Sequence, residues 1–233
     1  MRRTSDLPPG GTPGLAHPSS SPALQDGLAQ LGLALEDRAQ KQLQGYLDLI
    51  SRWNRVYNLT AVRNPSDMLT HHLLDSLAAW PALNRHLGPQ ENARILDVGS
   101  GAGLPGVVLA IAEPRWSVTC VDAVAKKAGF IRQVAAELGL GNLQAVHARV
   151  EELPAGEGHD VVTSRAFSSL GDFVSLTGHL LKPEGCWMAM KGRVPEDELA
   201  ALPSSIEVFH VEPLTVPGLD ARRCLVWMRK KAT

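Results

Sequence analysis

From residue 94 onward, short runs rich in β-branched residues alternate with stretches that have helical periodicity. The runs that predict strands are Arg94–Val98, Val118–Val121, Leu143–Val146, Asp160–Thr163 and Cys186–Met190. The stretches that predict helices begin near Leu104, cover Val124–Leu138 and lie near Leu170–Leu181. Strands that alternate with helices are typical of right-handed crossovers and a mostly parallel sheet. We therefore predict a doubly wound α/β fold.

The last part of the chain adds two strand-like runs, Ile206–Val211 and Cys224–Arg229, joined by a loop that contains proline and glycine. Two neighbouring strands connected in this way are typical of an antiparallel pair. We expect this pair to lie at one edge of the sheet.

The first ninety residues follow a different pattern. Residues 1–22 contain five prolines, three glycines and four serines, a composition that buries too little apolar surface to fold, and we predict a disordered leader there. Over residues 23–90, apolar side chains recur at steps of three and four. One such stripe consists of Leu43, Leu47, Ile50, Trp53 and Tyr57, with Tyr46 beside it, and another helix is expected to begin near Ser66-Asp67. The prediction is a helical appendage over 23–90, followed by a domain over 91–233.

Charge and cysteine content narrow the class of protein. The formal net charge is −1, so any surface that binds a polyanion must be local. The three cysteines, Cys120, Cys186 and Cys224, are far apart, which favours buried thiols in a reducing compartment over disulfides or metal ligands. No apolar run is long enough to span a bilayer and no signal-peptide core is present. We expect a cytoplasmic protein.

The stretch RILDVGSGAGLPG over residues 94–106 joins the first predicted strand to its helix. It contains a formal G-x-G-x-x-G match at Gly101, Gly103 and Gly106, which suggests a dinucleotide site. The register argues against that reading, because the glycines begin at Gly99 and the third glycine of the motif would then fall on Leu104. A G-K-[ST] sequence is also missing, so the loop is not a P-loop.

Two carboxylates indicate a different ligand. Asp97 lies two residues before Gly99. Its carboxylate would repel a pyrophosphate but attract a cation. S-adenosylmethionine carries an ammonium and a sulfonium and has no phosphate. Asp122 ends the second strand, where a carboxylate can accept the hydroxyls of a ribose. The alternative is that both acids cap the helices that follow them. We expect S-adenosylmethionine to be bound by Asp97, Asp122 and the loop glycines Gly99, Gly101 and Gly103.

Five segments together resemble the RsmG (GidB) family of bacterial enzymes, which methylate N7 of a guanine in 16S ribosomal RNA. They are NLTAVRNPSDMLTHHLLDSLA (58–78), DVGSGAGLPGVVLA (97–110), HARVEELP (147–154), VVTSRAFSSL (161–170) and AMKGR (189–193). The resemblance extends over about residues 23–230, in order, and leaves the proline-rich leader outside. The D-x-G-x-G element is shared by many methyltransferases, whereas N-L-T followed by H-x-L-D-S and S-R-A-F is far more specific.

The resemblance implies a class I (Rossmann-like) methyltransferase that uses S-adenosylmethionine. It also implies that the substrate is 16S ribosomal RNA, within the small ribosomal subunit or its assembly precursor. Gly99 and Leu104 would contact the cofactor, and Asp122 with the Val150-Glu151 pair would contact its adenosine. Arg165 would lie where methyl donor and base meet, as a catalytic and cofactor-binding residue.

Several basic residues are candidates for RNA contacts. Lys191, Arg193, Arg222 and Arg223 border the predicted carboxyl edge of the sheet, and we expect them to bind phosphates. Lys126, Lys127 and Arg132 lie on one predicted helix, and for these an RNA role and a solvated face remain equally open.

Two other kinds of site are weaker candidates. His71-His72 would point about 100° apart on an α-helix and lack a third ligand, so no metal is expected. Trp53 and Tyr57 could stack on RNA bases, but their position on an apolar stripe favours the core.

The chemistry of guanine N7 agrees with a site poor in acid–base pairs, because N7 has a lone pair and no proton to lose. Transfer to it needs positioning and electrostatics rather than a general base. The alternatives are another class I methyltransferase, a nicotinamide-dependent oxidoreductase, and a catalytically idle RNA-binding assembly factor.

Overall fold

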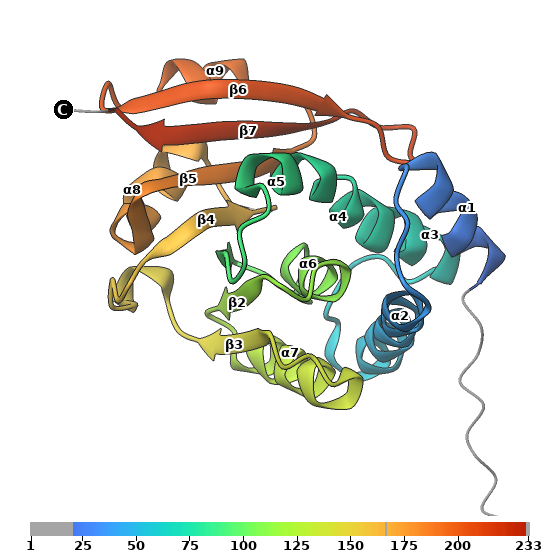
Figure 1. The fold of residues 1–233 in the computed structure, drawn as a ribbon. Helices are drawn as coiled ribbons and strands as arrows, with labels where there is room; N and C mark the ends of the chain where they lie inside the picture. The colour runs from blue at the N-terminus through green and yellow to red at the C-terminus, as the bar shows by residue number, and fades with distance from the viewer. Residues whose placement is uncertain (1–20, 166, 232–233) are drawn as a thin grey trace, which may run out of the picture.

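A seven-stranded sheet forms the centre of the computed structural model, which describes residues 21–165 and 167–231 (Figure 1). The strands are β1 (Arg94–Val98), β2 (Ser117–Asp122), β3 (Leu143–His147), β4 (His159–Ser164), β5 (Leu181–Lys191), β6 (Ile206–Leu214) and β7 (Arg223–Lys230). Their order is β3-β2-β1-β4-β5-β7-β6. The first five strands are parallel, and β7 pairs antiparallel with both β5 and β6. The predicted doubly wound α/β fold with an antiparallel edge pair is therefore confirmed.

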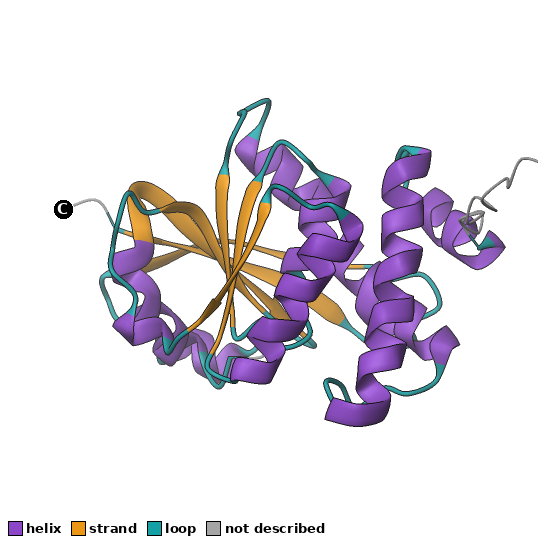
Figure 2. Cartoon of the chain, turned by 90° about the horizontal axis from the view of Figure 1, so that it is seen from below, coloured by secondary structure: helices purple, strands orange, loops and turns teal. Residues whose placement is uncertain are grey.

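Helices cover both faces of the sheet (Figure 2). Those that follow β1 are α6 (Gly106–Ala112), α7 (Ala125–Leu138), η2 (Val150–Glu152), α8 (Leu170–Thr177), η3 (Gly178–Leu180) and α9 (Glu196–Ala200). The helix predicted near Leu170–Leu181 is shorter than expected, and β5 begins at Leu181 rather than at Cys186. The reason is an irregularity in the β4–β5 pairing, where Leu181 pairs with His159 and regular pairing resumes only at Cys186.

The strands separate two hydrophobic cores, because successive side chains of a strand point to opposite faces. In β4, Val161 belongs to one core and Val162 to the other, and β7 divides Leu225 and Val226 in the same way. Helices α6 and α7 fill the first core, and α8 fills the second.

The N-terminal helices pack on the face that α6 and α7 cover. They are α1 (Pro22–Gln30), α2 (Asp37–Tyr57), α3 (Pro65–Met68), η1 (Leu69–Leu74), α4 (Asp75–Leu77) and α5 (Trp80–Leu87). Of the predicted leader, residues 1–20 lie outside the described residues. Ser21 caps α1 by accepting the Leu24 N–H at 3.3 Å, and Pro22 is the first helical residue, a position that favours proline.

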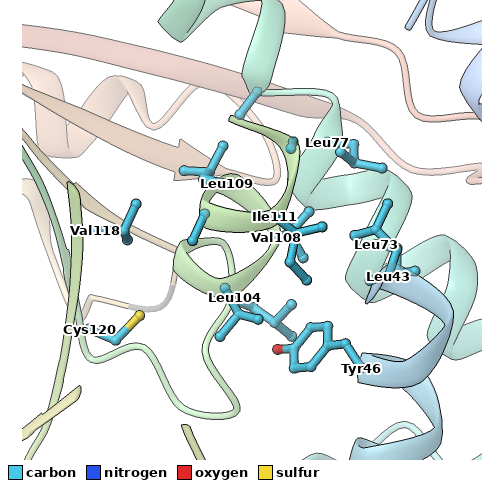
Figure 3. Close-up of a cluster of buried hydrophobic side chains, with 14 of the residues drawn as sticks. Leu43, Tyr46, Leu73, Leu77, Leu104, Val108, Leu109, Ile111, Val118 and Cys120 are labelled. Carbon is cyan, nitrogen blue, oxygen red and sulfur yellow. The ribbon is translucent and has the colours of Figure 1, made fainter. Parts of the chain in front are cut away.

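Apolar side chains of the N-terminal helices contact α6 directly (Figure 3). Leu43, Leu73 and Leu77 are fully buried in the same core as Val108 and Ile111. Each fully buried leucine contributes about 1.5–3 kcal/mol. These helices are therefore fixed against the segment that follows the glycine loop.

The end of α2 corrects one expectation. Trp53 is half-buried and packs on Phe130 of α7, with ring centroids 5.3 Å apart. Tyr57 is 43% exposed, so assigning it to the core was wrong. The physical reason is that Tyr57 is the last residue of α2 and lies over Trp53, at 5.0 Å, rather than over the core.

Within the described ranges, no helix combines the length and the apolar character needed to cross a bilayer.

Candidate active site

The loop between β1 and α6 has an unusual backbone. Gly99, Gly101 and Gly103 have φ values of 65°, 60° and 96°, which L-residues with side chains rarely adopt. A β-carbon at Gly99 or Gly101 would have no described atom within 4 Å, whereas one at Gly103 would collide with Val107. The first two glycines therefore face open space at the carboxyl ends of the strands.

Gly106 has a role that the sequence analysis did not give it. Any β-carbon there would come within 2.8 Å of Asp97 Oδ2 and would also collide with Cys120 Sγ. Glycine thus lets the start of α6 approach β1 and β2 closely. This is the packing function of the third glycine in dinucleotide folds, and the formal G-x-G-x-x-G match was the signal for it.

Asp97 is fully buried beneath this loop. Its Oδ2 accepts the Gly106 N–H at 2.8 Å and lies 3.9 Å from the Cys120 thiol. Its Oδ1 is buried and has no hydrogen-bond partner in the described part of the chain. Burial raises the pKa of Asp97 to about 7. An unpartnered carboxylate oxygen of this kind fits a cationic group such as the ammonium of S-adenosylmethionine.

Asp122 accepts two backbone N–H groups, one from each of the loops that follow β1 and β2. Its Oδ1 accepts the N–H of Val124, the residue before α7, at 2.8 Å, and its Oδ2 accepts the Gly101 N–H at 2.8 Å. Lys127 lies 3.9 Å away. A carboxylate has about four acceptor positions, so helix capping leaves acceptor positions for ribose hydroxyls.

The remaining cofactor candidates lie around the same edge. Val150 is buried at the start of η2, directly after β3, and the neighbouring Glu151 is more exposed and pairs with Arg149 at 3.5 Å. The side chain of Leu104 is 3% exposed and packs in the core (Figure 3).

Tyr46 ties α2 to the glycine loop. Its hydroxyl donates to the Ala102 carbonyl at 2.7 Å, and the pair is buried (Figure 3). The pKa of Tyr46 is raised well above its usual value, chiefly by burial, so the hydroxyl stays a donor. Tyr46 was expected only beside an apolar stripe, and its hydroxyl group was the signal for a polar partner.

Replacing Tyr46 with phenylalanine should weaken S-adenosylmethionine binding. The change leaves the buried Ala102 carbonyl unpaired, at a cost of about 1–3 kcal/mol, and loosens the loop. We expect affinity to fall by roughly fivefold or more in calorimetry. The Leu43→Met variant alters the same helix without touching the loop hydrogen bond and serves as the control. Equal affinities for parent and Tyr46→Phe would contradict a positioning role.

A buried carboxylate, Asp75, joins Arg165 and Arg223. Arg165 Nη1 donates to the His71 carbonyl at 2.8 Å and to Asp75 Oδ2 at 3.3 Å, and Arg223 Nε donates to Asp75 Oδ1 at 2.8 Å. The Asp75 side chain is only 4% exposed. Asp75 was not among the predicted site residues, and its signal was the H-x-L-D-S segment.

The N-L-T segment forms a second network beside this ion pair. Asn54 accepts the Thr60 N–H at 3.0 Å and donates to the Val62 carbonyl at 3.2 Å. The Thr60 hydroxyl accepts the Val62 N–H and contacts His72 Nε2 at 3.0 Å. The N-L-T and H-x-L-D-S segments are therefore in contact, and their hydrogen bonds stabilise the loop that contains Thr60 and Val62.

His71 and His72 lie in η1, which is a π-helix rather than the expected α-helix. The expected angle of about 100° between the two side chains assumed α-helical geometry, and both residues are among those that line one cavity. Single π-helical turns occur often at functional sites. Among the described residues, no group of three side chains that ligate metals is present.

The four predicted RNA contacts line a cleft of about 880 Å³ at the ends of β5, β6 and β7; they are Lys191, Arg193, Arg222 and Arg223. Lys191 pairs with Glu198 at 2.9 Å, and Arg223 pairs with Asp75. Arg193 and Arg222 are exposed, and within the described ranges neither has an ion-pair partner. Of the four predicted residues, these two carry a charge that no described carboxylate neutralises.

A family model described as "rRNA small subunit methyltransferase G" (GidB) matches residues 39–226. The chain belongs to this family. A relative in Methylibium petroleiphilum named "Ribosomal RNA small subunit methyltransferase G" is 62% identical, over 92% of this chain and 98% of its own. One of the same name in Polaromonas sp. is 59% identical, over 90% of this chain and 93% of its own.

Solved structures of low sequence identity share the fold of this GidB-family chain. TrmN from Thermus thermophilus has a TM-score of 0.53 at 22% identity, over 70% of this chain and 53% of that one. A SAM-dependent methyltransferase from Aquifex aeolicus has a TM-score of 0.52 at 18% identity, over 71% of this chain and 98% of that one. The predicted class I, Rossmann-like sheet is confirmed by these two comparisons.

Proposed function

We propose that this protein transfers a methyl group from S-adenosylmethionine to N7 of a guanine in 16S ribosomal RNA. The observation that carries the proposal is the open space over Gly99 and Gly101, with buried Asp97 beneath the loop and the Asp122 carboxylate bonded to the Gly101 N–H. The RNA substrate is inferred from membership of the GidB family.

Each of the predicted cofactor residues contacts a different part of S-adenosylmethionine. Asp97 holds the ammonium, and Asp122 accepts the ribose hydroxyls. Gly99, Gly101 and Gly103 let the backbone approach closely, and Leu104 adds a backbone contact. The Val150-Glu151 pair borders the adenine. S-adenosylmethionine, when bound, supplies a methyl group on a positively charged sulfur.

The protein's part in the transfer is positional. N7 attacks with its own lone pair, so no side chain has to remove a proton. Arg165, fixed by the His71 carbonyl and by Asp75, keeps donors directed at the base beside the loop. Holding two reactants in line is worth several kcal/mol of the barrier.

The RNA is the small-subunit RNA within the subunit or its assembly precursor, and the place of action is therefore the cytoplasm. Residues 91–233 form the methyltransferase domain. The helical appendage over 23–90 braces its glycine loop and one wall of the site.

Asp122→Ala should weaken S-adenosylmethionine binding by at least about tenfold, because a hydrogen bond to a charged group contributes roughly 1.5–3 kcal/mol. The substitution also releases the Gly101 N–H. Calorimetry measures the loss, with Asp172→Ala, an exposed acid in the first turn of α8, as the control. Unchanged affinity, or tight NAD binding by the parent, would contradict the assignment.

Arg193→Ala or Arg222→Ala should lower the slope of log RNA affinity against log salt by about 0.7–0.9, the value for one phosphate contact. Lys191→Ala should change the slope less, since Glu198 already neutralises its ammonium. Arg38, exposed on α2 beside the amino end of β3, gives the control Arg38→Ala. Slopes equal to the parent's in both arginine variants would place the RNA surface elsewhere.

Mass mapping of 16S ribosomal RNA from cells with and without the gene tests the function itself. We expect one guanine to carry an extra methyl group only when the gene is present. Identical RNA from both strains, combined with cofactor binding by the purified protein, would favour an idle assembly factor.

A further inference from the structure

The carboxyl end of α2 leaves an aromatic ring at the surface. Asn58 ends this helix in the left-handed conformation, with φ 48° and ψ 54°, a backbone shape that asparagine adopts more readily than most residues. Tyr57, the last helical residue, is 43% exposed, and its neighbour Val56 is 70% exposed. The Tyr57 ring lies against Trp53, which packs on Phe130 of α7. The exposed ring therefore has a fixed support.

Helix α2 runs antiparallel to α7 and lies against it (Figure 1). Near the start of α2, Gln42 Nε2 donates to the carbonyl of Leu138, the last residue of α7, at 2.8 Å. Further along α2, Trp53 meets Phe130, which is eight residues earlier in α7 than Leu138. The end of α2 that follows Trp53 therefore lies along the first turn of α7.

These two helix ends and the loop after α2 carry positive charge. Residues 49–66 contain Arg52, Arg55 and Arg63, residues 123–136 contain Lys126, Lys127 and Arg132, and neither segment contains an acidic residue. Arg63 Nη2 donates to Asn58 Oδ1 at 3.0 Å, which holds this arginine next to the end of α2. Lys126 is exposed in the first turn of α7. In the part of the chain that the structure describes, neither Arg63 nor Lys126 has an ion-pair partner.

The surface at this corner, called the Tyr57 patch below, consists of Trp53, Tyr57, Arg63 and Lys126. It lies beside the predicted cofactor site, because Lys127 Nζ is 3.9 Å from Asp122 Oδ2, and that oxygen accepts the Gly101 N–H. The cleft of about 880 Å³ lies farther along the sheet, at the ends of β5, β6 and β7. In the order of the strands, β1 with its glycine loop stands between β2, which precedes α7, and β5. The patch and the cleft therefore flank the glycine loop.

Resting on the proposed function, we infer that the Tyr57 patch binds the single-stranded RNA next to the target guanine. An unpaired base stacks on Tyr57, and phosphates pair with Arg63 and Lys126. Exposed aromatic rings beside unpaired cations are the combination with which proteins hold single strands, and stacking of this kind tolerates any base. The local cations supply an attraction for phosphate that the net charge of −1 does not. Tyr57 is then a positioning residue, because a strand held on both sides of the glycine loop presents its target between them.

The test observes Tyr57 directly. The chain contains two tyrosines, so 3-fluorotyrosine gives one ¹⁹F resonance for Tyr57 and one for the fully buried Tyr46. A short single-stranded oligoribonucleotide of mixed sequence is added to the full chain saturated with S-adenosylhomocysteine. We expect it to shift the Tyr57 resonance and to leave that of Tyr46 in place, and we expect a fully paired duplex of the same sequence to shift Tyr57 less. Tyr57→Phe identifies the resonance.

Binding of protein-free 16S ribosomal RNA at several salt concentrations gives the second readout. Tyr57→Ala should weaken binding about fivefold or more without changing the slope of log affinity against log salt, because stacking involves no charge. Tyr57→Phe keeps the ring and should bind like the parent. Arg63→Ala and Lys126→Ala should each lower the slope by about 0.7, the value for one contact with a single strand. Leu176→Ala, which truncates an exposed apolar residue of α8, is the control.

A Tyr57 resonance that stays in place up to the highest RNA concentration, or parent affinity in Tyr57→Ala, would overturn the inference. It would also be overturned if Tyr57→Ala bound assembled small subunits more weakly but protein-free RNA as well as the parent does, because the patch would then contact a ribosomal protein. A parent that transfers no methyl group to small-subunit RNA would instead contradict the proposed function, whatever the Tyr57 resonance does.

Discussion

Gly101→Val should abolish S-adenosylmethionine binding, with affinity reduced beyond about a hundredfold, while the fold persists. Gly101 has a φ of 60°, and a β-branched side chain there costs about 1–3 kcal/mol of strain. In the free protein an added β-carbon has no described atom within 4 Å, so the strain is the main structural cost. In the complex the valine would fill the space of the cofactor. Calorimetry measures the loss of binding, and circular dichroism measures the stability.

Gly139→Val is the control that introduces the same backbone strain without filling the cofactor site. Gly139 ends α7 with φ 64° and ψ 41°, it has no described atom within 4 Å of an added β-carbon, and it lies away from the glycine loop. We expect this variant to lose stability and keep full cofactor affinity. If Gly101→Val binds the cofactor normally, the loop does not form the site.

Arg165→Ala should reduce methyl transfer at saturating substrates by about a hundredfold or more, the usual cost of removing a donor aimed at the reacting group. RNA affinity should change little, because phosphate contacts come from Arg193 and Arg222. Asp75 keeps its ion pair with Arg223 in this variant, so the buried carboxylate is not left without a partner.

Arg165→Lys is the conservative comparison. A lysine keeps the charge but lacks the planar fork that holds the His71 carbonyl and Asp75 together, so we expect it to recover little activity. Single-turnover rates and RNA affinities are measured on the same preparations. A loss of RNA binding that accounts for the whole effect would make Arg165 a phosphate contact instead.

The glycine loop and its two acids could be predicted from the sequence because their relations are local. Asp97, Gly99 and Asp122 end or follow neighbouring strands, and in a parallel sheet those ends meet at one edge. Alternation of strand and helix patterns predicted the sheet for the same reason.

Contacts between segments far apart in the sequence could not be predicted in this way. Asp75 is 90 positions from Arg165 and 148 from Arg223, and nothing near Asp75 in the chain indicates that it joins both. The Lys191–Glu198 pair is local in sequence, but it depends on how α9 packs after β5. Because of this pair, Lys191 is not one of the unpaired cations expected to bind phosphate. The π-helix over Leu69–Leu74 has no signature in helical periodicity, so an α-helix was expected there.

The most direct test of the whole account is a reconstitution with purified protein, methyl-labelled S-adenosylmethionine and small subunits from cells that lack the gene. The modified RNA is digested and the labelled nucleoside is identified by mass and by the lability that N7 methylation gives to the glycosidic bond. We expect one labelled guanine, methylated at N7, and no label with Gly101→Val. Label on another atom or base, or transfer that survives Gly101→Val, would contradict this expectation.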